Sequence, residues 1–170
     1  PTFANYQRMI QGVHDMNAKL MISVWANFGP QTKQYAHFNG KGRMIEAVSY
    51  PFGAGVKPYD CYDETTRDEY WAYLYSGLMS KDIDALWLDS SEPDYQQQSP
   101  NDYDYVTGTG QTWRELRNAF PLAHVGGVHD HFYLFFNELR YIYNSIILFL
   151  TIFKKLFLKS LWVLFSSVKN

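Results

Sequence analysis

Two short apolar runs divide the first half of the chain and limit the folds open to it. Residues 19–25 and 83–88 are almost continuous runs of apolar side chains, typical of strands buried on both faces in a parallel sheet. Apolar spacing predicts a helix before each run, one over residues 3–16 that ends at Asn17 and one that begins at an Asp63 cap. Helices that alternate with such strands predict an α/β fold.

The segments between and after the two apolar runs limit the possible folds further. Residues 51–62 are rich in Gly and Pro and predict a loop, and residues 110–125 predict a further helix that Pro121 should kink or end. This order fits part of a (β/α)8 TIM barrel or a doubly wound sheet, and in both the chemistry lies at the carboxyl ends of the strands. Trp25 and Asp89 both stand at such ends.

Asp89 is the residue of this set best suited to chemistry. A carboxylate that ends a buried strand has a rigid support, so it can attack an anomeric carbon or stabilise the oxocarbenium-like charge that develops there. The alternative is a capping role, because the sequence Asp-Ser-Ser-Glu-Pro-Asp at 89–94 also favours a turn. Spacing alone leaves both interpretations open. Glu92 is interpreted as orienting the loop through hydrogen bonds.

Composition excludes several function classes. The formal net charge is −2 and no basic stripe occurs in the first 130 residues, which argues against a nucleic-acid partner. The single Cys61 excludes an intrachain disulfide and a Cys-rich zinc site, and the pair His129 and His131 is too small for a metal site. Aromatic residues make up 18% of the chain, and many stand beside Asp, Gly or Pro, as they do in carbohydrate clefts.

The composition changes at residue 132. Residues 132–170 contain no Gly, Pro or Asp and carry a net charge of +4, which leaves −6 on residues 1–131. We therefore predict a partial (β/α)8 catalytic domain over 1–131 and an apolar, basic tail over 132–170, either helical or disordered.

The start at Pro1, without an initiator Met or a leader, indicates a fragment of a longer protein.

Three interpretations of this tail are open. A transmembrane helix is disfavoured, because the apolar stretch 141–153 is shorter than the roughly 20 residues needed to cross a bilayer. A helix lying on the membrane surface fits the lysines beside a Phe, Leu and Ile field. Out-of-frame or intron-derived translation is favoured, because the tail consists largely of amino acids with AT-rich codons.

The segment from Trp87 to Asp94, Trp-Leu-Asp-Ser-Ser-Glu-Pro-Asp, resembles the nucleophile motif of glycoside hydrolase family 31 in the form typical of its α-xylosidase-like branch. Residues 9–30, 59–71 and 108–128 are similar to the family's neighbouring segments, in the same order. The resemblance implies a retaining α-glycosidase that hydrolyses terminal α-linked xylose or glucose by double displacement, without a metal or organic cofactor.

The resemblance also implies roles for single residues. Asp89 would be the nucleophile, Trp25 would line the pocket for the −1 sugar, and Phe52 takes a place where relatives often carry Trp against the sugar. Asp60 and Glu92 would support the nucleophile loop. The family's acid/base Asp, its sugar-binding Arg and its His have no counterpart in this sequence, so we expect the chain to be inactive alone.

The expected partner is an oligosaccharide or other α-glycoside substrate, with membrane contact only through residues 132–170. The alternative function is a non-catalytic carbohydrate-binding or membrane-associated protein. Family members are often secreted or periplasmic, and the composition of this chain favours no compartment.

Overall fold

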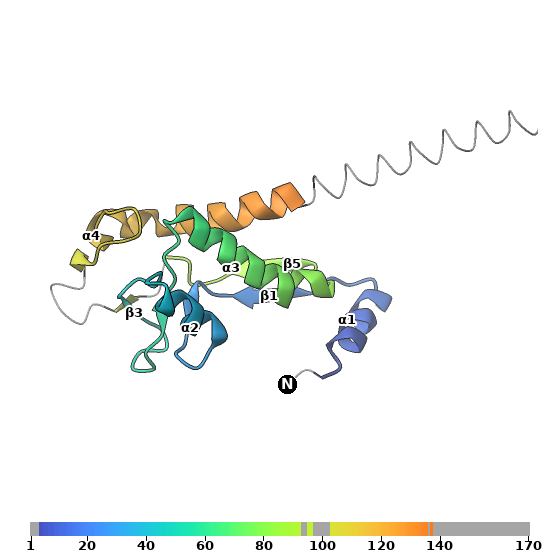
Figure 1. Ribbon diagram of the computed structural model, residues 1–170. Helices are drawn as coiled ribbons and strands as arrows, with labels where there is room; N and C mark the ends of the chain where they lie inside the picture. Colours follow the sequence, from blue (N-terminus) through green and yellow to red (C-terminus); the bar gives the residue numbers. More distant parts are fainter. Residues whose placement is uncertain (1–3, 93–94, 97–102, 136, 138–170) are drawn as a thin grey trace, which may run out of the picture. The chain divides into compact units, whose positions relative to one another are not determined.

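The computed structural model describes residues 4–92, 95–96, 103–135 and 137 (Figure 1). Contacts divide the chain into two units, 1–129 and 130–170. The first unit holds all the helices and strands named below, and residues 130–135 of the second are helical. The tail predicted from residue 132 lies almost wholly outside the described residues. Within those residues, no helix is both long and apolar enough to cross a membrane.

The first predicted helix is confirmed as α1, Tyr6–Asp15. It ends where the sequence predicts, because Asn17 adopts a left-handed conformation with φ of 56°. The Asn17 N–H donates to the carbonyl of His14 at 2.8 Å, and the Ala18 N–H donates to the carbonyl of Val13 at 3.2 Å. These bonds satisfy carbonyls that the end of a helix otherwise leaves without partners.

The two predicted strands are confirmed as neighbours in one parallel pair. Strand β1, Met21–Val24, pairs with β5, Ala85–Leu88, so that Met21 lies opposite Ala85 and Val24 lies opposite Leu88. Parallel strands need a crossover connection, and the segment between them contains the long helix α3, Glu64–Gly77. Figure 1 shows α3 running beside the β1–β5 pair.

The prediction that both faces of these strands are buried is wrong. Val24, Leu86 and Leu88 pack against the hydrophobic core, whereas Met21 is 53% exposed and Trp87 is 59% exposed. Side chains alternate between the two faces of a strand, and within the described residues the core lies on one face only. The other face is therefore open to solvent.

Helix α3 begins as the sequence predicts. The Asp63 carboxylate accepts hydrogen bonds from the backbone N–H and the hydroxyl of Thr66, both at 2.7 Å, which is the geometry of an N-terminal cap. Tyr70 and Leu74, four residues apart and on one side of the helix, are both buried.

Shorter elements connect β1 to α3. In chain order they are β2 (Asn27–Phe28), α2 (Lys33–Gly40), β3 (Val48–Ser49) and β4 (Lys57–Pro58). Strand β2 pairs with β4, and β3 pairs with the later β6 (Tyr95–Gln96), both antiparallel. The predicted loop over 51–62 therefore contains a two-residue strand, because Lys57 and Pro58 find partners distant in the sequence.

The helix predicted over 110–125 is divided in the structure. Helix α4 (Trp113–Leu116) and a 3₁₀ turn, η3 (Arg117–Ala119), are followed by a separate helical segment that begins at residue 120. Pro121 lies in the first turn of this later segment, where a proline loses no hydrogen bond because the first N–H groups of a helix have no partner within it. The predicted interruption of the helix is therefore confirmed next to Pro121, which itself stands at the start of the later helical segment.

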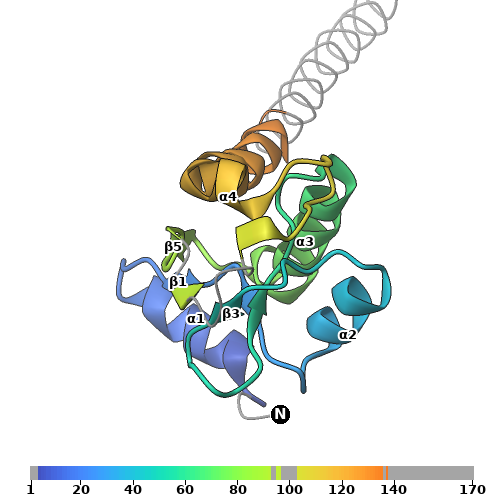
Figure 2. The ribbon, with the colours of Figure 1, turned by 90° about the vertical axis from the view of Figure 1, so that its left-hand side faces the viewer.

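Aromatic side chains fill the core between α3 and the helical residues 120–129, which lie side by side in Figure 2. The rings of Tyr59 and Tyr70 stack with centroids 4.3 Å apart and an interplanar angle of 2°. The hydroxyl of Tyr59 forms a hydrogen bond of 2.9 Å with Nδ1 of His124, whose side chain is fully buried.

Close packing of these two helices makes Gly127 sensitive to substitution. A Cβ added there would lie 2.5 Å from Cδ of Arg67, whose guanidinium is held by hydrogen bonds to the carbonyls of Cys61 and Tyr62. We expect Gly127→Ala to lower the free energy of unfolding by about 1–3 kcal/mol in urea titrations. Gly126→Ala is the matched control: nothing lies within 4 Å of its added Cβ, so it should stabilise the helix by about 0.5–1 kcal/mol. Equal effects of the two substitutions would contradict this packing.

Candidate active site

Asp89 follows directly after β5, at the carboxyl end of the parallel pair. Its backbone N–H donates to the carbonyl of Val24, the last residue of β1, at 3.1 Å, and also lies 3.1 Å from the carbonyl oxygen of Trp87. Its side chain is exposed, and Oδ1 accepts the N–H of Ser90 at 3.0 Å. The carboxylate is thus mounted on a backbone that is tied to the end of the neighbouring strand.

The solvent-exposed face of the strand pair corresponds to the interior of a barrel. Ser23 and Trp87 lie opposite each other in the register and on the face away from the core. In a closed barrel one face of each strand turns to the helices and the other to the barrel interior. The core lies on the helix side, so Trp87 stands on the face that corresponds to the interior. Sequence reasoning assigned no separate role to Trp87.

Trp25 belongs to a row of three aromatic rings. Its ring centroid lies 5.6 Å from that of Tyr50, which in turn lies 5.9 Å from that of Phe52. Tyr50 is 48% exposed and Phe52 is 45% exposed, so the row is open to solvent. The structure therefore brings the two predicted sugar-binding residues together through Tyr50, which sequence reasoning missed because the contact depends on the fold of the 48–52 segment.

Asp60 is buried and fastens two loops together. Its carboxylate accepts the backbone N–H of Tyr62 at 3.1 Å and that of Gly108 at 2.5 Å. Burial raises the pKa of Asp60, and the two N–H donors oppose this shift because they stabilise the ionised form. These bonds join the loop before α3 to the loop before α4. Support of the nucleophile loop by Asp60 stays a prediction.

Glu92 lies three residues after Asp89 and is exposed. The next two residues, 93 and 94, lie outside the described residues, so most of its predicted loop does too. Its predicted supporting role also stays a prediction.

The arrangement supplies half of what a retaining glycosidase needs. An exposed carboxylate at a rigid strand end can attack an anomeric carbon, and exposed aromatic faces such as those of Tyr50 and Phe52 suit the C–H surface of a sugar ring. Retaining hydrolysis also needs a second carboxyl group about 5–5.5 Å from the first. None of the site residues predicted from the sequence fills that role.

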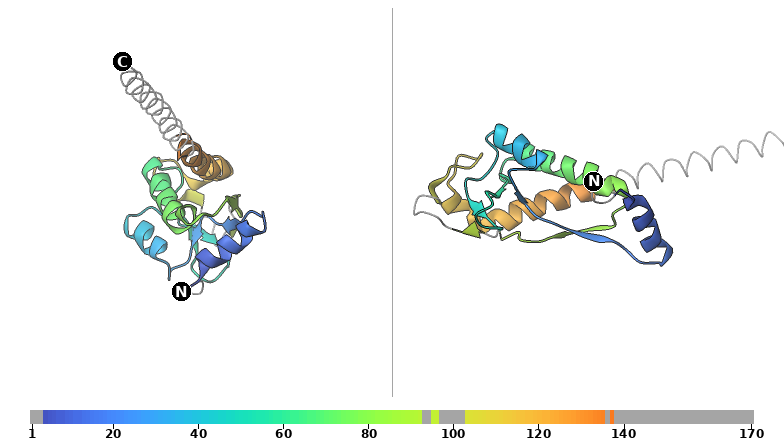
Figure 3. Two further views of the ribbon diagram at one scale, coloured as in Figure 1. Left: turned by 90° about the vertical axis from the view of Figure 1, so that its right-hand side faces the viewer. Right: turned by 90° about the horizontal axis from the view of Figure 1, so that it is seen from below.

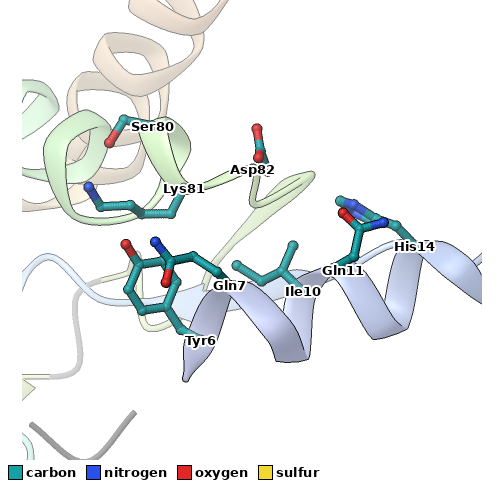
Figure 4. Close-up of a pocket in the computed structure, with 8 residues that line it drawn as sticks. All are labelled: Tyr6, Gln7, Ile10, Gln11, His14, Ser80, Lys81 and Asp82. Atoms are coloured by element: carbon teal, nitrogen blue, oxygen red, sulfur yellow. The ribbon is translucent and has the colours of Figure 1, made fainter. Parts of the chain in front are cut away.

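A separate cavity lies between α1 and the segment of η1 (Met79–Lys81) and Asp82 (Figure 4). It has a volume of about 330 Å³ and is lined by Tyr6, Gln7, Ile10, Gln11, His14, Ser80, Lys81 and Asp82. Figure 3 shows α1 near the end of the strand pair where β1 begins. Trp25 and Asp89 follow the last residues of β1 and β5, at the opposite end of the pair. This cavity therefore does not belong to the candidate active site.

Residues 1–143 match the glycosyl hydrolases family 31 TIM-barrel domain. The chain belongs to glycoside hydrolase family 31, a family of O-glycosyl hydrolases. The parallel β1–β5 pair and helix α3 are accordingly part of a TIM-barrel fold. The match ends at residue 143, past the predicted domain boundary at 131, and that boundary stays a prediction.

An α-xylosidase and an α-glucosidase stand among the relatives of this chain. The chain is 32% identical over 133 residues to an α-xylosidase of Saccharolobus solfataricus, covering 75% of this chain and 17% of the relative. It is 31% identical over 99 residues to an α-glucosidase of the same organism, covering 54% of this chain and 14% of that relative. The chain thus spans less than a quarter of the length of these curated relatives.

Solved structures agree on the fold. A GH31 α-xylosidase from Xanthomonas citri aligns with a TM-score of 0.62 and 30% identity, over 72% of this chain and 14% of its own. A GH31 α-xylosidase from a soil metagenome, complexed with xylose, aligns with a TM-score of 0.65 and 23% identity, over 74% of this chain and 19% of its own. A dextranase of Flavobacterium johnsoniae has a TM-score of 0.66 and 17% identity, over 76% of this chain and 17% of its own.

Proposed function

We propose that this chain carries the nucleophile side of a retaining α-glycosidase active site, with Asp89 as the nucleophile. The observation that carries the proposal is the hydrogen bond between the Asp89 N–H and the Val24 carbonyl. It fixes the carboxylate at the carboxyl end of two adjacent parallel strands, where TIM-barrel enzymes hold their catalytic groups.

The first chemical step follows from this placement. A carboxylate oxygen of Asp89 bonds to the anomeric carbon as the bond to the leaving oxygen breaks, which gives a covalent β-linked glycosyl ester. Water then attacks the same carbon, releases the carboxylate and restores the α configuration. A separate carboxyl group protonates the leaving oxygen and later deprotonates the water, and we assign that group to a part of the barrel outside this chain.

The substrate we propose is a terminal α-linked xylose, with α-linked glucose as the alternative. The 32% identical α-xylosidase and the 30% identical α-xylosidase structure favour xylose. Trp25 and Phe52, joined by Tyr50, would provide the apolar wall against the sugar ring. Trp87 stands on the open face of β5, two residues before Asp89.

A chimera tests this function in a complete barrel. In the Saccharolobus solfataricus α-xylosidase, the segment that matches this chain is replaced by residues 1–131. We expect the chimera to hydrolyse an aryl α-xyloside faster than the aryl α-glucoside, and proton NMR to detect α-xylose as the first anomer released. A folded chimera that released β-xylose first would contradict a retaining mechanism.

A further inference from the structure

We propose that Tyr70, in the middle of α3, is a positioning residue for the candidate sugar site. Its hydroxyl donates a hydrogen bond of 3.0 Å to the backbone carbonyl of Trp25. The inference rests on the proposed function, because it concerns the residue expected to form the wall of the −1 pocket. Figure 1 shows α3 alongside β1, on the helix side of the strand pair.

The segment that carries Trp25 is held at three consecutive carbonyls. The carbonyl of Val24 accepts the Asp89 N–H at 3.1 Å, that of Trp25 accepts the Tyr70 hydroxyl at 3.0 Å, and that of Ala26 accepts the Tyr59 N–H at 3.1 Å. The first and third bonds come from backbone groups. The bond to Trp25 is made by a side chain, so a single substitution can remove it.

Tyr70 is itself fixed in place. Its side chain is 2% exposed, and its ring stacks on Tyr59 and lies 5.3 Å from the ring of His124 in an edge-on contact. Burial raises the pKa of Tyr70, so its phenol keeps the proton that it donates across the working pH range. Because the donor is rigid, its hydrogen bond holds the Trp25 backbone in a fixed position relative to Asp89.

The chain offers a matched control in the same ring stack. Tyr59 is also fully buried, but its hydroxyl bonds to His124 and not to the strand ends. Tyr59→Phe keeps the backbone hydrogen bond from the N–H of residue 59 to the Ala26 carbonyl. Tyr70→Phe and Tyr59→Phe therefore each remove one buried hydroxyl, at a similar cost in stability, and differ in whether the bond at Trp25 is lost.

Hydrogen exchange of the whole 170-residue chain tests the proposal without substrate. We expect Tyr70→Phe to speed exchange of the Asp89 and Tyr59 amides about tenfold relative to the Leu78 amide, which bonds to the Leu74 carbonyl at the C-terminal end of α3. The carbonyl carbon resonance of Trp25 should shift as its hydrogen bond is lost. Tyr59→Phe should change neither the exchange rates of these amides relative to the Leu78 amide nor the carbonyl carbon resonance of Trp25. Equal changes in the two variants would overturn the proposal, because Tyr70 would then act only through core packing.

A xylose titration separates this inference from the proposed function. The indole N–H resonance of Trp25 is followed as xylose is added to each variant. We expect a saturable shift in the wild-type chain, an apparent Kd raised by about threefold or more in Tyr70→Phe, and no change in Tyr59→Phe. A wild-type chain that shows no shift would contradict the proposed sugar site, while the exchange comparison would still decide whether Tyr70 holds the Trp25 segment.

Discussion

Replacing Asp89 by Ala in the chimera is expected to lower kcat/KM for an aryl α-xyloside by about 10⁴-fold or more. The physical reason is that the first displacement has no nucleophile without this carboxylate. Azide should restore turnover, because the small side chain leaves room for the anion beside the anomeric carbon, and the product should be the β-xylosyl azide. Xylose release and NMR of the azide product measure both effects.

Glu92→Gln is the matched control for Asp89→Ala. It removes a carboxylate three residues away from Asp89, and we expect Glu92 only to support the nucleophile loop. We expect a loss of activity far smaller than for Asp89→Ala and no rescue by azide. A chimera in which Asp89→Ala keeps normal turnover would refute the nucleophile assignment.

Acid is expected to destabilise the chain through His124, by about 3 kcal/mol in total. Burial lowers the pKa of His124 to about 4, from an unfolded value near 6.5. Because the folded pKa is the lower one, the unfolded state binds the proton first. Stability is therefore complete above about pH 6.5 and is lost as the pH falls toward 4, where the loss levels off.

The surroundings of His124 explain the direction of this shift. Its side chain is 0% exposed and packed among the rings of Tyr59, Tyr70 and Phe120. Nδ1 bonds to the Tyr59 hydroxyl, and Nε2 has no hydrogen-bond partner within the described residues. A charged imidazole here would have little to stabilise it.

Urea titrations between pH 4 and 7 measure this effect. His124→Leu should reduce the slope of unfolding free energy against pH in that window, although it lowers the stability near neutral pH. His129→Gln, on the exposed side of the same helix, is the control and should keep the wild-type slope. Identical slopes in wild type and His124→Leu would show that other groups cause the acid loss.

Local signals explain which parts of the fold could be predicted from the sequence. The left-handed Asn17, the Asp63 cap and the apolar runs at β1 and β5 act within a few residues, so their elements could be located. The two-residue strands depend on partners far along the chain, which a local pattern does not contain. Helix α2 was missed because it buries only Phe38, although Thr32 caps it.

In the candidate site, too, some residues could be found from local sequence, whereas others depend on contacts between distant segments. Asp89 and Trp25 could be found because each follows an apolar strand, and the parallel register of β1 and β5 brings those strand ends together. Tyr70 is a buried residue of a helix, and from the sequence alone that place indicates packing only. Its bond to the Trp25 carbonyl follows from the way α3 lies on β1, which no spacing in the sequence specifies.

Trapping the glycosyl-enzyme tests the central claim most directly. The probe is 5-fluoro-α-xylosyl fluoride, whose fluoride departs without protonation, so the first step needs the nucleophile alone, while the ring fluorine slows breakdown of the ester. We expect peptide mass spectrometry of the treated chimera to place one fluoroxylosyl group on Asp89, and none in Asp89→Ala. A label on any other residue, or a folded and active chimera that gains no label at Asp89, would contradict the account.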